Sequence, residues 1–138
     1  MADKEGSMDT IELSLPANAA YVTAARQTAQ SIAGRAGFDA DEVEEVKSAV
    51  SEACNYCIKK LAANGAGSFK IVFSPGKGRI EIKITCPTAG YGDDGEDDYS
   101  LTLIRGQMET FVITETDTGI EMVMSKRHMY GFLDSGLY

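Results

Sequence analysis

Three cysteines are the first residues whose spacing could do chemistry. Cys54 and Cys57 form a C-x-x-C pair, and Cys86 stands alone. A redox-active pair of this kind usually lies at a helix N-terminus, where the dipole lowers the thiol pKa. Here the pair falls inside a long helical pattern. An odd number of cysteines also gives no paired metal-ligand spacing. We therefore predict that these thiols pack as small core residues.

A run of five carboxylates is the second candidate for chemistry: Asp93, Asp94, Glu96, Asp97 and Asp98. Such a run could bind a divalent cation, but it lacks the ligand register of a calcium loop. A charge run of this kind is more often a solvated loop.

His128 is the single histidine of the chain. One histidine leaves little material for a zinc cluster or for a histidine-based triad. We expect His128 to be a surface residue beside the basic pair Lys126 and Arg127.

Two helices must position these residues. Residues 17–36 are rich in alanine, with an apolar stripe at three- and four-residue steps, and Gly37 stops the helix. Asp39 is the expected N-cap of a second helix, with Glu42 as its capping-box partner. That helix extends to about residue 63 and ends at an Asn-Gly pair.

Five strands complete the expected elements. Residues 10–15 alternate as a half-buried strand. Residues 68–74 and 79–86 form a hairpin around residues 75–78. A glycine- and acid-rich loop at 87–98 leads to a short helix at 101–111, and residues 111–114 and 120–124 form a second hairpin. This order predicts an α+β fold, a two-layer sandwich with helices on one face of a mostly antiparallel sheet.

The bulk composition narrows the class of protein. The chain has 138 residues, which fits a single domain over 1–138, with residues 1–8 as a flexible N-terminus. A net charge of -8 disfavours direct binding to nucleic acid or to an anionic membrane. No apolar run reaches the roughly 18 residues of a membrane span, and residues 1–7 do not read as a signal peptide. We expect a cytoplasmic protein. The apolar tail at 127–138 is expected to dock on its own domain, on a second subunit or on a partner.

The segments L-P-A-N-A-A-Y-V and G-F-D-A-D-E-V-E-E-V-K-S-A-V-S-E-A-C, within residues 15–61, carry a family resemblance. They resemble the front half of bacterial anti-sigma factors that double as serine kinases, the stress and sporulation type with the Bergerat fold of the GHKL superfamily. The later I-R-G-Q-M-E segment, residues 104–109, is similar to the helix that closes the family's ATP lid. The resemblance covers about residues 11–126.

The resemblance implies a nucleotide site on the second helix. Glu52 matches the family's general-base glutamate. The position of its magnesium-binding asparagine holds Tyr56, while Asn55 lies one residue earlier. Because steps of three and four residues stay on roughly one helix face, Asn55 could take the magnesium role with shifted geometry. The other interpretation is that Asn55 is an ordinary polar residue and Tyr56 fills part of the site.

The remaining nucleotide motifs also depart from the family pattern. Thr88 stands where the family has its adenine-binding aspartate, although the glycine spacing survives at Gly90 and Gly92. The lid, which would include Thr102, has lost its glycines and follows the acidic run. Five carboxylates beside a triphosphate would repel it unless magnesium intervened.

Three hypotheses about function follow from this resemblance. The first is a homodimeric anti-sigma factor that sequesters a sigma factor or similar transcription regulator, is opposed by an anti-anti-sigma factor, and has weakened or lost ATP binding. The second is an active serine protein kinase that phosphorylates the antagonist with ATP and magnesium, through Glu52 as base and Asn55 as metal ligand. A third is a remodelled pocket for another ligand, which Tyr56, Tyr91 and Tyr99 could line or simply fill.

Overall fold

The computed structural model describes residues 9–63, 67–88 and 98–129. The chain runs β1 (Ile11–Pro16), a 3-10 turn (Ala19–Tyr21), α1 (Val22–Ala36), α2 (Ala40–Ala63), β2 (Ser68–Gly76), β3 (Arg79–Cys86), α3 (Tyr99–Gln107), β4 (Thr110–Thr116) and β5 (Gly119–Arg127). This is the predicted element order. The tail residues 130–138 lie outside the described residues, and Arg127 belongs to β5.

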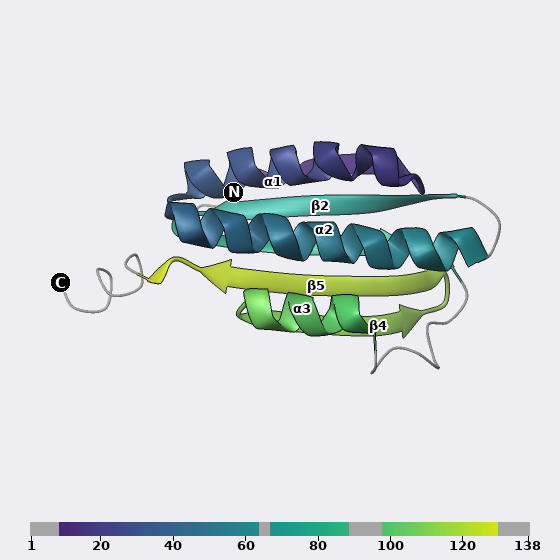
Figure 1. Cartoon of the computed structure of the whole chain (residues 1–138). Coiled ribbons are helices and arrows are strands. Elements are labelled where there is room, and N and C mark those ends of the chain that lie inside the picture. Colours follow the sequence, from purple (N-terminus) through teal and green to yellow (C-terminus); the bar gives the residue numbers. More distant parts are fainter. Residues whose placement is uncertain (1–8, 64–66, 89–97, 130–138) are drawn as a thin grey trace.

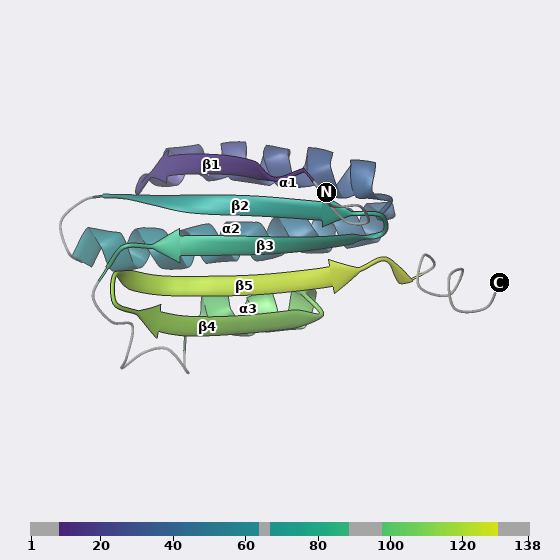
Figure 2. The same cartoon turned by 180° about the vertical axis from the view of Figure 1, so that it is seen from behind.

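The strands form one antiparallel sheet in the order β1-β2-β3-β5-β4. The three helices cover one face of this sheet, with α2 in the middle, α1 toward β1 and β2, and α3 over β4 and β5 (Figure 1). Seen from behind, all five strands are in view, because the described helices leave the other face uncovered (Figure 2). The predicted two-layer α+β sandwich is confirmed.

The core lies between the sheet and the helices. Alternate side chains of β2, β3 and β5 point into it and are buried: Phe69, Ile71, Phe73, Ile80, Ile82, Ile84, Cys86, Ile120, Met122 and Met124. The register aligns one apolar row across the sheet, because Phe73 lies opposite Ile82 and Ile82 lies opposite Met124. Burial of such rows is the main force that holds a two-layer sandwich together.

The helix-end signals are largely confirmed. Gly37 ends α1 with a left-handed φ of 105°. The backbone N–H of Asp39 donates to Glu42 Oε1 and the backbone N–H of Glu42 donates to Asp39 Oδ1, both at 2.9 Å, which is the predicted capping box. Two boundaries were wrong. The first helix starts later, because Asn18 caps a 3-10 turn before Val22. The third runs from Tyr99 to Gln107, because Asp98 caps it and the paired strand β4 begins at Thr110.

The described part of the chain contains no helix that is long and apolar enough to cross a membrane.

Candidate functional site

Two neighbouring residues of α2 face opposite environments. Tyr56 is completely buried, whereas the side chain of its neighbour Asn55 is exposed. Successive helical residues are turned by about 100°, so a shift of one position moves a side chain from the core face to the solvent. The ring of Tyr56 also lies under two ammonium groups, at 5.7 Å from Lys59 and 5.5 Å from Lys60. Tyr56 is therefore part of the packed interior.

The side chain of Glu52 contacts the first turn of α3. Its Oε1 accepts a hydrogen bond of 2.9 Å from the hydroxyl of Ser100. Two helical turns later, Lys59 makes an ion pair with Asp98. Asp98 is also the N-cap of α3, since its Oδ1 accepts from the backbone N–H of Ser100 at 2.8 Å. The sequence pattern contains an N-cap signal in Asp98, but nothing in it identifies Ser100 and Lys59 as the contacts between the two helices.

Thr88 lies at the end of β3 and is buried, and its backbone N–H donates to Cys86 O at 2.9 Å. Thr102 is exposed on α3, with its hydroxyl 3.4 Å from Asp98 O. The glycines at 90 and 92, Tyr91 and the carboxylates at 93–97 lie outside the described residues. Tyr99 is 74% exposed, so it does not fill a pocket beside Tyr56.

The cysteines occupy the core as predicted. All three are buried and unpaired in disulfides, with Cys54 and Cys57 in the middle of α2 rather than at its start. Burial raises the pKa of Cys54 to about 12. The thiol of Cys86 lies 3.9 Å from Cys57 O. A side-chain hydrogen bond with Cys86, together with burial, raises the pKa of Cys57 well above its ordinary value. Neither helical cysteine has the lowered pKa of a redox C-x-x-C pair.

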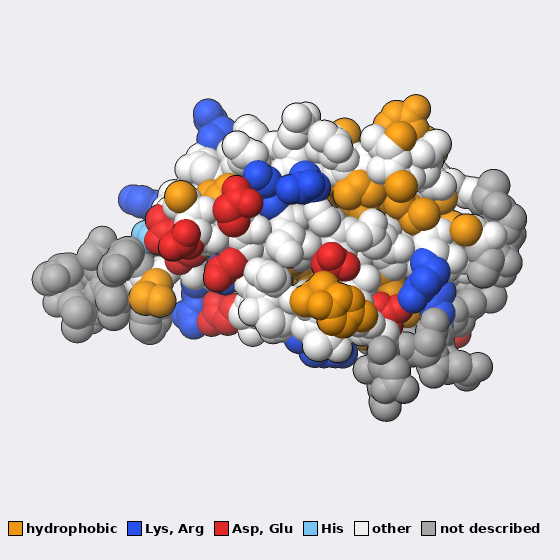
Figure 3. Space-filling view, viewed as in Figure 1, with side chains coloured by type: hydrophobic (Ala, Val, Ile, Leu, Met, Phe, Trp, Pro, Cys, Tyr) orange, Lys and Arg blue, Asp and Glu red, His pale blue; other side chains and the backbone are white. Residues whose placement is uncertain are grey.

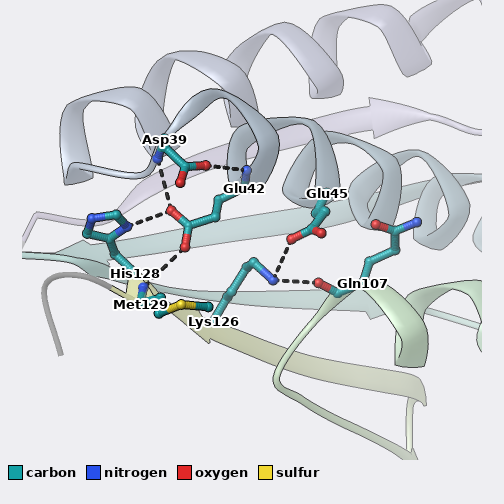
Figure 4. Close-up of polar contacts among 7 residues, drawn as sticks. All are labelled: Asp39, Glu42, Glu45, Gln107, Lys126, His128 and Met129. Atoms are coloured by element: carbon teal, nitrogen blue, oxygen red, sulfur yellow. Dashed lines mark hydrogen bonds and ion pairs between the residues drawn. The ribbon is translucent and has the colours of Figure 1, made fainter. Parts of the chain in front are cut away.

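A second polar cluster joins the end of β5 to the first turns of α2 (Figure 4). His128 Nδ1 lies 2.6 Å from Glu42 Oε1, and the backbone N–H of Met129 donates to Glu42 Oε2 at 3.1 Å. One turn further along α2, Glu45 makes an ion pair of 2.9 Å with Lys126, and the same ammonium group donates to Gln107 O at 2.8 Å.

The side chain of His128 is only 16% exposed, so the prediction of a surface histidine was wrong. The contact between Glu42 and His128 was not predicted because the two residues lie far apart in sequence.

Asp39, Glu42 and His128 bring three possible ligand atoms within 4.8 Å of one another, the one such group found among the described residues. Their atoms already bond to one another and to backbone N–H groups, so the geometry is that of a satisfied structural cluster. Acidic side chains gather over this end of α2 on the molecular surface (Figure 3).

The cluster shifts the titration of Glu42. Burial raises the pKa of Glu42, but hydrogen bonds from the backbone of Asp39, from His128 and from the backbone of Met129 outweigh it. The pKa therefore lies below its ordinary value of 4.5. A carboxyl with a lowered folded-state pKa stabilises the fold above its unfolded pKa, and this stabilisation disappears as the pH falls through the folded-state value.

Replacing Glu42 with glutamine is expected to remove part of the acid sensitivity of the fold below about pH 4.5. Replacing it with alanine should lower the free energy of unfolding at neutral pH by about 1–2 kcal/mol, because it removes the capping acceptor and the partner of His128. Urea unfolding over a series of acidic and neutral pH values measures both effects. Glu44→Gln is the matched control, since Glu44 is exposed and its ion pair is with Lys47 on the same helix. Equal acid sensitivity in Glu42→Gln and wild type would contradict the assignment.

The described residues fit a magnesium-nucleotide site poorly. The side chain expected to supply a magnesium ligand, Asn55, is exposed, and the position that matches the family's ligand is filled by the buried Tyr56. The Glu52 carboxylate is hydrogen-bonded to the hydroxyl of Ser100, whose backbone N–H donates to the buried carboxylate of Asp98, the N-cap of α3. Magnesium requires near-ideal octahedral oxygen geometry, which this arrangement does not offer.

An antiparallel sheet covered on one face by three helices, with the candidate site between α2 and α3, is the architecture of a histidine kinase-like ATPase domain. The family model for that domain matches residues 15–126, and the chain belongs to this family.

Within it, the chain is similar to proteins named serine-protein kinase RsbW. It is 37% identical over 76 residues to those of Bacillus thuringiensis (strain Al Hakam), Bacillus cereus (strain AH187) and Bacillus anthracis. The match covers 55% of this chain and 48% of the relative, so the similarity spans about half the length of each protein.

Proposed function

We propose that this protein is an anti-sigma type regulator, which binds a sigma factor or similar transcription regulator and keeps it from RNA polymerase. By family resemblance its second partner is an anti-anti-sigma factor, its working form is a homodimer and its location is the cytoplasm. The similarity to the serine-protein kinases RsbW supports this assignment. The complete burial of Tyr56 is the observation that carries the further claim that ATP binding is weakened or lost.

Tyr56 supports that claim through packing. A tyrosine buried in the core cannot be moved aside without opening a cavity, which costs several kcal/mol. The buried stripe of α2, which includes Val46, Val50 and Leu61, holds the helix in the rotation that buries Tyr56 and leaves Asn55 exposed.

The alternative is an active serine protein kinase, with Glu52 as general base and Asn55 as magnesium ligand. Its support is the name of the relatives and the match of Glu52 to the catalytic glutamate. In such a kinase, catalysis depends on positioning and charge neutralisation around the transferred phosphate.

Calorimetry with ATP and with ADP, in the presence of magnesium, separates the two functions. We expect no detectable heat of binding at millimolar nucleotide. A dissociation constant in the micromolar range would contradict the weakened site and favour the kinase. Phosphate transfer to an antagonist that is abolished by Glu52→Ala, but retained by Glu81→Ala on the uncovered face of the sheet, would establish the kinase.

Partner capture tests the regulatory role independently of nucleotide. The purified protein, used as bait in a lysate of its source organism, is expected to retain a sigma factor or an anti-anti-sigma factor. Recovery of neither protein, under conditions in which the bait is folded, would contradict the proposed function.

A further inference from the structure

The N-terminus of α3 is joined to α2 by two polar bridges. Ser100 donates to Glu52 Oε1 at 2.9 Å, and the ammonium group of Lys59 pairs with the carboxylate of Asp98. Glu52 and Lys59 are seven residues apart on α2, which places them on one side of the helix, two turns apart. We call these four residues the α3 latch.

One member of the latch, Asp98, has a carboxylate that is almost completely buried. The side chain of Asp98 is 2% exposed, whereas that of Lys59 is 57% exposed. A buried charge is tolerated when it is paired and hydrogen-bonded. Asp98 satisfies both conditions, because Lys59 supplies the opposite charge and the backbone N–H of Ser100 donates to Oδ1 at 2.8 Å. Removing either partner should therefore loosen this end of the helix.

An apolar contact completes the attachment of α3. Leu101 and Ile104 are fully buried on the face of α3 that packs against α2 and the sheet. On the opposite side Tyr99 is 74% exposed, so the helix presents an aromatic side chain outward while its inner face is anchored. The orientation of this outer face therefore depends on how firmly the inner face is held.

The anion at the N-terminus of α3 is supplied by the chain itself. The N-terminus of a helix attracts anions because its first N–H groups are unpaired and its dipole is positive there. In this protein the Asp98 carboxylate accepts those N–H groups, and Lys59 neutralises it. No external anion is needed to complete this end of α3.

We propose that the α3 latch holds α3 against α2 without nucleotide, so that Lys59 and Asp98 are positioning residues for α3 and the carboxylate of Glu52 is engaged by Ser100. This inference rests on the proposed function and deepens that function by stating how the site is regulated. A nucleotide-independent latch keeps the outer face of α3 in one orientation whether or not nucleotide is present.

Hydrogen exchange measured by mass spectrometry on the full chain tests the latch. Amides of α3 should be protected in the wild type without nucleotide, and millimolar magnesium-ATP should leave their exchange unchanged. Lys59→Met and Ser100→Ala should each accelerate exchange in α3 by about five- to tenfold, the effect of losing one polar contact. Glu52→Gln should retain protection because its amide oxygen can still accept from Ser100, whereas Glu52→Ala should lose it.

Two internal comparisons separate the latch from general destabilisation. Lys83→Met removes a lysine of similar exposure, 50% for Lys83 against 57% for Lys59, from its ion pair with Glu121 at 3.2 Å on the sheet, and should leave α3 exchange unchanged. Peptides from β2 and β3 in the same spectra should keep wild-type exchange in the latch variants.

Protection of α3 that appears only after magnesium-ATP is added would overturn the proposal. So would wild-type exchange of α3 in both Lys59→Met and Ser100→Ala. Neither result depends on a partner, so failure of the latch remains distinguishable from failure of the anti-sigma assignment, which partner capture tests.

Discussion

Replacing Gly119 with alanine is expected to lower the free energy of unfolding by about 3–5 kcal/mol, among the largest effects of any single substitution. Gly119 begins β5 at a φ of 154°, where the hairpin passes directly over the end of β3. A Cβ atom placed there would lie 2.1 Å from Cys86 O and 2.8 Å from both Pro87 Cα and Thr88 N. All three are backbone atoms, so relief requires the two strand ends to separate.

Urea unfolding of Gly119→Ala measures the expected loss. Gly106→Ala is the matched control. A Cβ at Gly106 meets no atom within 4 Å, and Gly106 lies in α3, where alanine is the better helix former by about 0.5–1 kcal/mol. The two variants should therefore move stability in opposite directions. A Gly119→Ala protein as stable as wild type would show that the end of β3 can yield. Because the backbone nitrogen of Thr88 is one of the atoms in contact, the same substitution should also disturb the hydrogen bond from Thr88 N–H to Cys86 O.

Replacing Tyr56 with alanine should cost about 3–5 kcal/mol of unfolding free energy, because it removes the largest fully buried side chain of the described residues and leaves a cavity in the core. Tyr56→Phe keeps the ring and almost the same volume, so it should cost about 1 kcal/mol or less. Chemical unfolding of both variants at neutral pH makes the comparison.

A second substitution at position 56 tests whether Tyr56 alone prevents nucleotide binding. Tyr56→Asn restores the residue type that the family resemblance implies for magnesium binding. We expect it to destabilise the fold as the alanine variant does, and to gain no nucleotide binding in calorimetry, because Glu52 remains hydrogen-bonded to Ser100. Micromolar affinity for magnesium-ATP in Tyr56→Asn would show that Tyr56 alone blocks the site. A stability loss below about 1 kcal/mol in Tyr56→Ala would contradict its role as a core residue.

Patterns that act over a few residues were readable in the sequence. The alternation of Ile80, Ile82 and Ile84 predicted a strand with one buried face, and all three are buried. The pairing of Asp39 with Glu42 predicted a capping box, and both of its hydrogen bonds are present. The mid-helix position of Cys54 and Cys57 predicted buried structural thiols. Local hydrogen bonds and periodic burial dominate these features, so sequence spacing was sufficient.

The two interpretations of Asn55 and Tyr56 could not be separated in this way. Steps of three and four residues share a broad helix face, and only the packing of α2 against the sheet decides which member of a neighbouring pair enters the core. In this fold Tyr56 is buried and Asn55 is exposed. The role of Asn55 in metal binding stays a prediction for calorimetry.

By itself, the sequence determined the α+β class, the order of the elements, the ends of the second helix and the family resemblance, because each depends on local propensity, periodicity or motif. The tertiary structure alone decided which distant side chains meet: Glu42 with His128, Lys59 with Asp98, Glu52 with Ser100, and Gly119 with the end of β3. The partners in these contacts lie between 31 positions apart, for Gly119 and Thr88, and 86 positions apart, for Glu42 and His128. Their partners are chosen by how the helices pack on the sheet, and no local pattern along the chain encodes that choice.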